Sequence, residues 1–220
     1  MKKRRRRRYT TILAALIVAF LSTTPAYSDT IYSSFGPADS FATSSALVVG
    51  SYNEGPSNTP VATQWGFSFT PSFEATLDSI KFAAAYFSGN NALNAVLMSD
   101  FGGLPATALE TFNFTGLSGS PTLYSASSTL HPVLSEATTY WIVLAPQGNG
   151  LFGWYEDDML SGPLAARKDL LASDPNWQTV SALYPTYFAV NGTPVPIPAA
   201  AWLLGSGVVG LVVMRRRVKP

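Results

Sequence analysis

The sequence predicts an all-β fold, a single jelly-roll-like β-sandwich that lies between two terminal segments of different character. Three observations indicate this fold. The apolar runs are short and are separated by turns rich in glycine, proline, asparagine and serine. No stretch keeps the periodicity of an amphipathic helix for long. Several runs instead alternate with the period of two that is typical of strands, most clearly from Gly66 to Thr70.

Composition and charge narrow the class of protein. The chain has 220 residues, of which 47% are hydrophobic and none is cysteine, so it is neither a disordered chain nor a disulfide scaffold. Residues 29–194 hold all 13 acidic residues but only three basic ones, Lys81, Arg167 and Lys168, a formal net charge of −10. An acidic domain repels phosphate backbones, so we expect no nucleic-acid partner.

Residues 1–28 have the order of a secretory signal peptide. Seven basic residues at positions 2–8 precede ten apolar residues at 12–21. Ala26 and Ser28 then supply the small residues that signal peptidase requires, so cleavage would leave Asp29 as the first mature residue; Ala26 itself closes a second candidate site. The alternative is a retained signal anchor, but ten apolar residues in a helix rise only about 15 Å, half of a roughly 30 Å hydrocarbon core.

Residues 29–194 are expected to form one exported domain. We expect two short helices, at 83–87 and at 161–172, and a loop over 52–60. The expected strands are 46–51, 63–69, 76–83, 93–98, 108–114, 124–128, 139–144, 152–155 and 186–190.

Residues 195–220 form a third segment. The run from Val195 to Pro198 is too rich in proline for a helix or a sheet ladder and predicts an extended linker. Residues 199–214 carry no charge and predict a transmembrane helix of about 24 Å, and the basic tail 215–220 follows, which should stay in the cytoplasm. The residues expected to set and pack this helix are Trp202 at the outer boundary, Gly205 and Gly207 on its small-residue face, and Arg215, Arg216 and Arg217 as the stop-transfer cluster.

The order of a Val-Pro-x-Pro motif, the helix AAAWLLGSG and an arginine cluster resembles the PEP-CTERM sorting signal of Gram-negative bacteria. The resemblance implies that an exosortase, a membrane-embedded cysteine transpeptidase, cuts near the motif and passes the protein to the cell surface or into exopolysaccharide. Pro196 and Pro198 match the two prolines of the signal. Ile197 replaces the usual glutamate, as in the Val-Pro-Leu-Pro-Ala variant, and leaves the exosortase subtype open.

The middle of the chain carries a second resemblance. The outline from the Trp-Gly-Phe-Ser-Phe run at 65–69 through Gly102-Gly103-Leu104-Pro105 to Gly153-Trp154 is similar to the jelly-roll domains, sometimes labelled choice-of-anchor, that precede sorting tails. This resemblance implies a fold rather than an activity.

Few residues are suited to catalysis. His131 is the sole histidine, and without a cysteine or a nucleophile-elbow motif it makes neither a catalytic triad nor a usual zinc site, so we expect no catalytic residue, no cofactor and no enzyme activity. The one candidate ligand patch is Trp154, Glu156 and Asp158, where acids follow an aromatic pair and we expect Trp154 to be exposed. This patch is a solvated acidic loop, a calcium site or a sugar-binding face.

Taken together, the sequence predicts an inner-membrane intermediate that is later moved to the cell surface or the extracellular matrix. Signal peptidase, exosortase, the membrane and extracellular polysaccharide are the expected partners. For the mature domain a structural or adhesive role comes first. A carbohydrate-binding module of exopolysaccharide is the alternative, and a glycan hydrolase is a more distant one.

Overall fold

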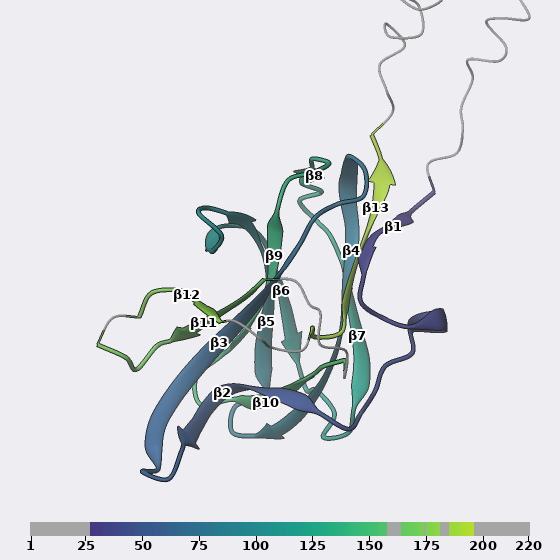
Figure 1. Ribbon diagram of the computed structural model, residues 1–220. Helices are drawn as coiled ribbons and strands as arrows, with labels where there is room; N and C mark the ends of the chain where they lie inside the picture. Colours follow the sequence, from purple (N-terminus) through teal and green to yellow (C-terminus); the bar gives the residue numbers. More distant parts are fainter. Residues whose placement is uncertain (1–26, 158–163, 174, 181–184, 196–220) are drawn as a thin grey trace, which may run out of the picture.

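The computed structural model describes residues 27–157, 164–173, 175–180 and 185–195, and this part of the chain is all-β (Figure 1). One 3-10 turn, η1 (Pro37–Asp39), interrupts the strands. The strands are β1 (Asp29–Ser33), β2 (Ala46–Glu54), β3 (Thr59–Phe69), β4 (Ala75–Ser88), β5 (Ala92–Asp100), β6 (Pro105–Thr115), β7 (Thr122–Ser127), β8 (Val133–Leu134), β9 (Tyr140–Pro146), β10 (Leu151–Tyr155), β11 (Ala165–Asp169), β12 (Gln178–Val180) and β13 (Phe188–Pro194).

The described strands form one curled antiparallel sheet. Its main path runs β1-β13-β4-β10-β2-β3-β9-β5-β6, with β7 and β8 paired to β4, and β11 paired to β3 and β12. Strand β4 pairs with β13 along its first half and with β10 along its second, so it bends from one group of strands toward the other. Strands β10 and β2 therefore connect the β1-β13-β4-β7 group to the β3-β9-β5-β6 group.

The hydrophobic core lies inside this curl. It is built from the inward-facing residues of alternating strands, and its largest fully buried members include Trp154, Phe67, Phe82, Phe152 and Phe188. The ring of Trp154 packs edge-on against Phe67, with centroids 5.2 Å apart. Burial of large aromatic rings is the main source of stability in a domain without disulfides.

Two smaller clusters lie outside the main core. In the first, Phe35 and Phe41, from the segment before β2, pack on Tyr155 and Tyr187. The second consists of Trp141, Val143 and Ala166, with partly buried Val96, Met98, Leu104, Ala145 and Trp177 packed against them. The expected strand 139–144 is confirmed as β9, and its run from Tyr140 to Leu144 is buried throughout.

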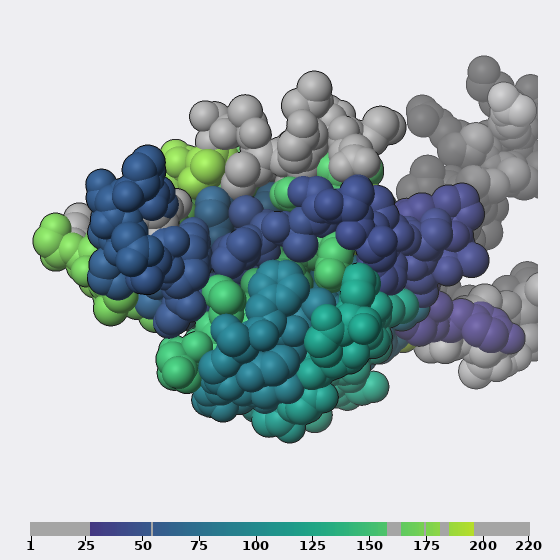
Figure 2. Space-filling view, turned by 90° about the horizontal axis from the view of Figure 1, so that it is seen from below, coloured from purple at the N-terminus to yellow at the C-terminus, as the bar shows by residue number. Residues whose placement is uncertain are grey.

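The turns at the end of the molecule opposite β8 are joined by hydrogen bonds. The amide of Leu117 donates to Asn91 Oδ1 (2.8 Å), and Asn91 Nδ2 donates back to the carbonyl of Leu117 (2.9 Å). The amide of Gln147 donates to the carbonyl of Ala92 (2.9 Å). Seen from below, these teal and green turns are packed beside the purple segment that leads into β2 (Figure 2).

Three local predictions are wrong. Residues 83–87, expected as a helix, lie within β4, and the described part of the expected helix 161–172 contains β11. The expected loop 52–60 is a hairpin, because β2 continues to Glu54 and β3 begins at Thr59 after a four-residue turn. In each case pairing with neighbouring strands outweighs the local preference of the sequence.

Candidate functional site

The predicted ligand patch does not form an aromatic surface. Trp154 lies on β10, between β2 and β4, and is 0% exposed. Its indole Nε1–H donates to the carbonyl of Tyr187 (3.2 Å). The expectation that Trp154 is exposed is therefore wrong, because both neighbouring strands and the core cover it.

The side chain of Glu156 is buried and hydrogen-bonded within the domain and does not face solvent. The residue is 8% exposed, and Ser45 Oγ donates to its Oε1 at 2.6 Å. Glu156 also forms an isolated bridge with Thr186 and donates its amide to the carbonyl of Ser45 (3.3 Å). These contacts hold the segment before β2 against the end of β10. Asp158 lies outside the described residues.

A second buried carboxylate, that of Glu110, binds the loop before β8. Glu110 on β6 is 4% exposed and accepts hydrogen bonds from Ser128 Oγ (2.5 Å), from the amide of Thr129 (2.6 Å) and from the amide of Leu130 (3.2 Å). Burial raises the pKa of Glu110, but the hydrogen bonds from these residues outweigh it and hold the pKa below its usual value. Glu110 thus anchors the loop that leads to β8.

His131 lies in this loop, between β7 and β8. Its backbone φ is 47°, its amide donates to Ser128 Oγ (2.9 Å), and its Nδ1 lies 2.9 Å from the carbonyl oxygen of Leu77. These contacts give His131 a role in fixing the loop between β7 and β8.

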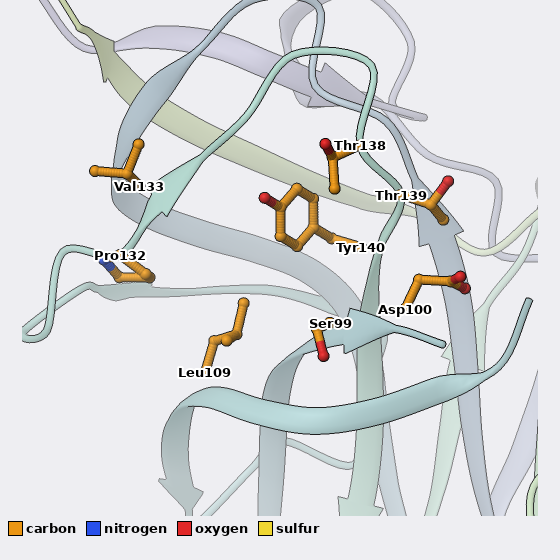
Figure 3. Close-up of a pocket in the computed structure, with 8 residues that line it drawn as sticks. All are labelled: Ser99, Asp100, Leu109, Pro132, Val133, Thr138, Thr139 and Tyr140. Atoms are coloured by element: carbon orange, nitrogen blue, oxygen red, sulfur yellow. The ribbon is translucent and has the colours of Figure 1, made fainter. Parts of the chain in front are cut away.

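Next to this loop is a groove that we call the Tyr140 groove. It has a volume of about 450 Å³. Figure 3 shows the phenol ring of Tyr140 in the middle of the lining residues, with Pro132 and Val133 on one side and Asp100 and Thr139 on the other. The residues that line the groove are Ser99, Asp100, Leu109, Pro132, Val133, Thr138, Thr139 and Tyr140.

Hydrogen bonds hold the polar wall of the groove in place. Trp141 Nε1–H donates to Asp100 Oδ1 (2.8 Å), and the amide of Gly103 donates to Asp100 Oδ2 (3.2 Å). The Tyr140 hydroxyl accepts from the amide of Ser135 (3.0 Å), which fixes the turn before β9. These hydrogen bonds lie within the chain and hold Asp100 and Tyr140 in place.

The sequence did not reveal this groove, because its lining comes from four separate segments: the end of β5, the middle of β6, the start of β8 and the start of β9. No single motif contains these residues. The one available signal was the pair of threonines directly before the buried run that starts at Tyr140.

The two ends of the described domain lie together. Strand β1 begins at Asp29, which is opposite Gly192 of β13, and in Figure 1 both strands reach the upper end of the molecule. The amide of Val195 donates to the carbonyl of Glu74 (3.1 Å) just after β13 ends. The groove is at this same end, since Ala75 pairs with both Pro194 and Leu134.

Most of the remaining predicted signal residues lie outside the described structure. Ser28 is within it and is exposed. The residues outside the described ranges are Ala26, Pro196, Ile197, Pro198, Trp202, Gly205, Gly207, Arg215, Arg216 and Arg217. No helix in the described part of the chain is long and apolar enough to cross a membrane.

Comparison of the chain with known protein families, with characterised proteins and with solved structures finds no significant match.

Proposed function

We propose that this chain is an exported protein of a Gram-negative cell that an exosortase processes, and that its mature domain has a structural or adhesive role at the cell surface or in the extracellular matrix. The observation that carries the proposal is where the β domain starts and stops. Strand β1 begins at Asp29, directly after the expected signal peptidase site, and β13 ends at Pro194, directly before the Val-Pro-x-Pro motif.

We propose the following order of events. Signal peptidase removes residues 1–28, the domain folds outside the cytoplasm, and the segment 199–214 holds it in the membrane as an intermediate. Because the amide of Val195 still bonds to Glu74, the motif follows the sheet without a spacer. The proline content of the motif predicts an extended segment, and a protease cleft could engage the peptide groups of such a segment.

We also propose that the all-β domain is a jelly-roll-like β-sandwich. This fold is supported by the two groups of strands, β1-β13-β4-β7 and β3-β9-β5-β6, whose inward-facing residues share one core. In such a fold β2 and β10 connect the two sheets at one end.

We propose no catalytic role and no resident cofactor for the domain. His131 and Glu110, the two groups with the most specific local contacts, each serve to fix the loop before β8. A carbohydrate-binding role is the second candidate, and the Tyr140 groove is the observation that favours it.

The test is replacement of both motif prolines, Pro196→Ala with Pro198→Ala, in a strain that contains the cognate exosortase. We expect an uncut, larger species that stays in the membrane fraction, because the cleavable segment can then join the helix that follows it. Deletion from Val195 onward should instead release the protein into the periplasm. Immunoblots of membrane, periplasm, surface and medium fractions measure both outcomes.

Pro194→Ala is the matched control, because Pro194 is an exposed proline two residues before Pro196 and ends β13. It should be processed like the wild type. The proposal fails if the double-alanine protein reaches the surface or the medium at wild-type size.

A further inference from the structure

We propose that the Tyr140 groove is a binding site for a neutral saccharide. The inference stands on the described side chains alone and does not depend on the sorting pathway proposed above. Its basis is a groove with one apolar wall and one polar wall, in which hydrogen bonds hold Ser99, Asp100 and Tyr140 and whose lining includes no basic residue.

The two walls match the two kinds of surface on a sugar ring. Leu109, Pro132 and Val133 form the apolar wall, against which the C–H face of a sugar can pack (Figure 3). Ser99, Asp100, Thr138 and Thr139 form the polar wall. Small-molecule sites commonly combine an apolar lining with a few well-placed polar groups in this way.

The polar wall keeps hydrogen-bonding capacity for a ligand. Ser99 Oγ accepts from the amide of Thr107 (3.2 Å) and the Tyr140 hydroxyl accepts from the amide of Ser135, so neither bond uses the hydroxyl hydrogen. Each oxygen of Asp100 accepts one N–H and has a second lone pair. The groove can therefore both donate to and accept from sugar hydroxyls.

Charge restricts the ligand to neutral sugars. Asp100 is the charged residue in the lining. Two further acidic residues are close to the lining in sequence. Glu110 directly follows Leu109, and Glu136 lies two residues before Thr138. The three basic residues of the domain lie elsewhere: Lys81 pairs with Asp39 (2.6 Å), and Arg167 and Lys168 are on β11. A carboxylated or phosphorylated sugar would meet repulsion here without a compensating cation.

The size and position of the groove suit a saccharide chain. Its volume of about 450 Å³ is toward the lower end of the range for small-molecule pockets. Val133 is 56% exposed and Thr138 is also exposed, so the groove opens to solvent at its rim. A short stretch of a longer polysaccharide can lie in it while the rest continues outside.

The test uses the full-length chain, purified in a zwitterionic detergent without a sugar headgroup so that the detergent does not compete. The probes are an array of neutral glucan, mannan and galactan oligosaccharides together with uronic acid oligosaccharides of equal length. We expect binding to at least one neutral series in preference to the uronic acid series. Calorimetric titration with the best neutral oligosaccharide then gives a dissociation constant.

Two groove variants and one control locate the binding. Val133→Asp puts a carboxylate on the apolar wall and should weaken binding about tenfold, and Thr139→Val removes one hydroxyl at nearly constant shape and should weaken it about fivefold. Leu171→Asp is the matched control, because Leu171 is 61% exposed in the turn after β11 and is not in the groove lining. Its affinity should equal that of the wild type, and circular dichroism verifies that each variant is folded.

Three results would overturn the inference. These are an array on which no neutral oligosaccharide binds, a preference for the uronic acid series, and wild-type affinity in a folded Val133→Asp variant. None of them bears on export or exosortase processing, which the Pro196 and Pro198 variants test separately.

Discussion

Glu110 shows how one buried carboxylate can fix a loop beside the groove. It joins β6 to the loop of residues 128–131, and this loop leads to Pro132 and Val133 on the apolar wall of the groove. A carboxylate that accepts several hydrogen bonds at a buried position stabilises the fold when it is ionised. The groove therefore depends on the charge state of a residue that does not line it.

Replacing Glu110 by glutamine should make the domain less stable and less sensitive to acid. We expect a loss of about 2 kcal/mol at pH 7, because a hydrogen-bonded charge is exchanged for a neutral amide. The folded-state pKa of Glu110 is lowered, so its stabilisation is complete above the unfolded-state pKa of about 4.3 and is lost as the pH falls through the folded-state value. Thermal unfolding of the full-length protein and of Glu110→Gln at pH 7 and pH 3 measures this.

The gap in melting temperature between the two proteins should narrow toward pH 3. A gap of the same size at both pH values would mean that the carboxylate is not ionised and bonded in the folded state.

At the scale of the element, β13 is the strand that ties the two ends of the domain together. It lies between β1 and β4, and Gly192 pairs with Asp29 of β1 and with Leu77 of β4. A Cβ at Gly192 would be 2.5 Å from Ile31 Cδ1 and 2.5 Å from the carbonyl oxygen of Thr76. The backbone oxygen cannot move aside as a side chain can, so only glycine fits there.

Gly192→Ala should therefore destabilise the domain by about 1–3 kcal/mol, as overpacking of a close contact does. Gly119→Ala is the control, because its added Cβ would meet only the carbonyl oxygen of Tyr86, at an ordinary 3.7 Å. Thermal unfolding followed by circular dichroism compares the two variants. Equal melting temperatures would contradict the close packing of β13 on β1 and β4.

The strands were predictable wherever alternation was clear, and the errors have a physical pattern. Strand β3 was predicted from the alternation of residues 66–70, and its Phe67 and Phe69 lie in the core. The alanine-rich stretch of β4 and the Ala-Ala-Arg-Lys stretch of β11 favour helix locally, yet each forms ladders with neighbouring strands that only the folded chain brings together. Periodicity in a single strand does not contain that information.

At the scale of the whole molecule, local sequence patterns predict the terminal segments but not the groove. The signal-peptide and sorting-signal predictions rest on consecutive residues, whereas the Tyr140 groove is assembled from residues between 99 and 140 that no local pattern connects. Trp154 was misjudged for the same reason. Its acidic neighbours in the sequence indicate exposure, whereas β2, β4 and the core determine its burial.

The strands of the domain begin at Asp29 and end at Pro194, next to Val195, and both ends lie on one side of the molecule. Export and processing should act on the chain just outside these two points, because the peptide groups inside them are bonded into the sheet. Both cleavages should therefore leave the described fold intact.

The most direct test of this central claim is the intact mass of the protein recovered from the cell surface or the medium of its native host, with sequencing of both ends. We expect a chain that begins at Asp29 and ends within or next to the Val195–Pro198 motif, without the arginines at 215–217. A recovered chain that begins at Met1, or that still carries Arg215 to Arg217, would contradict it.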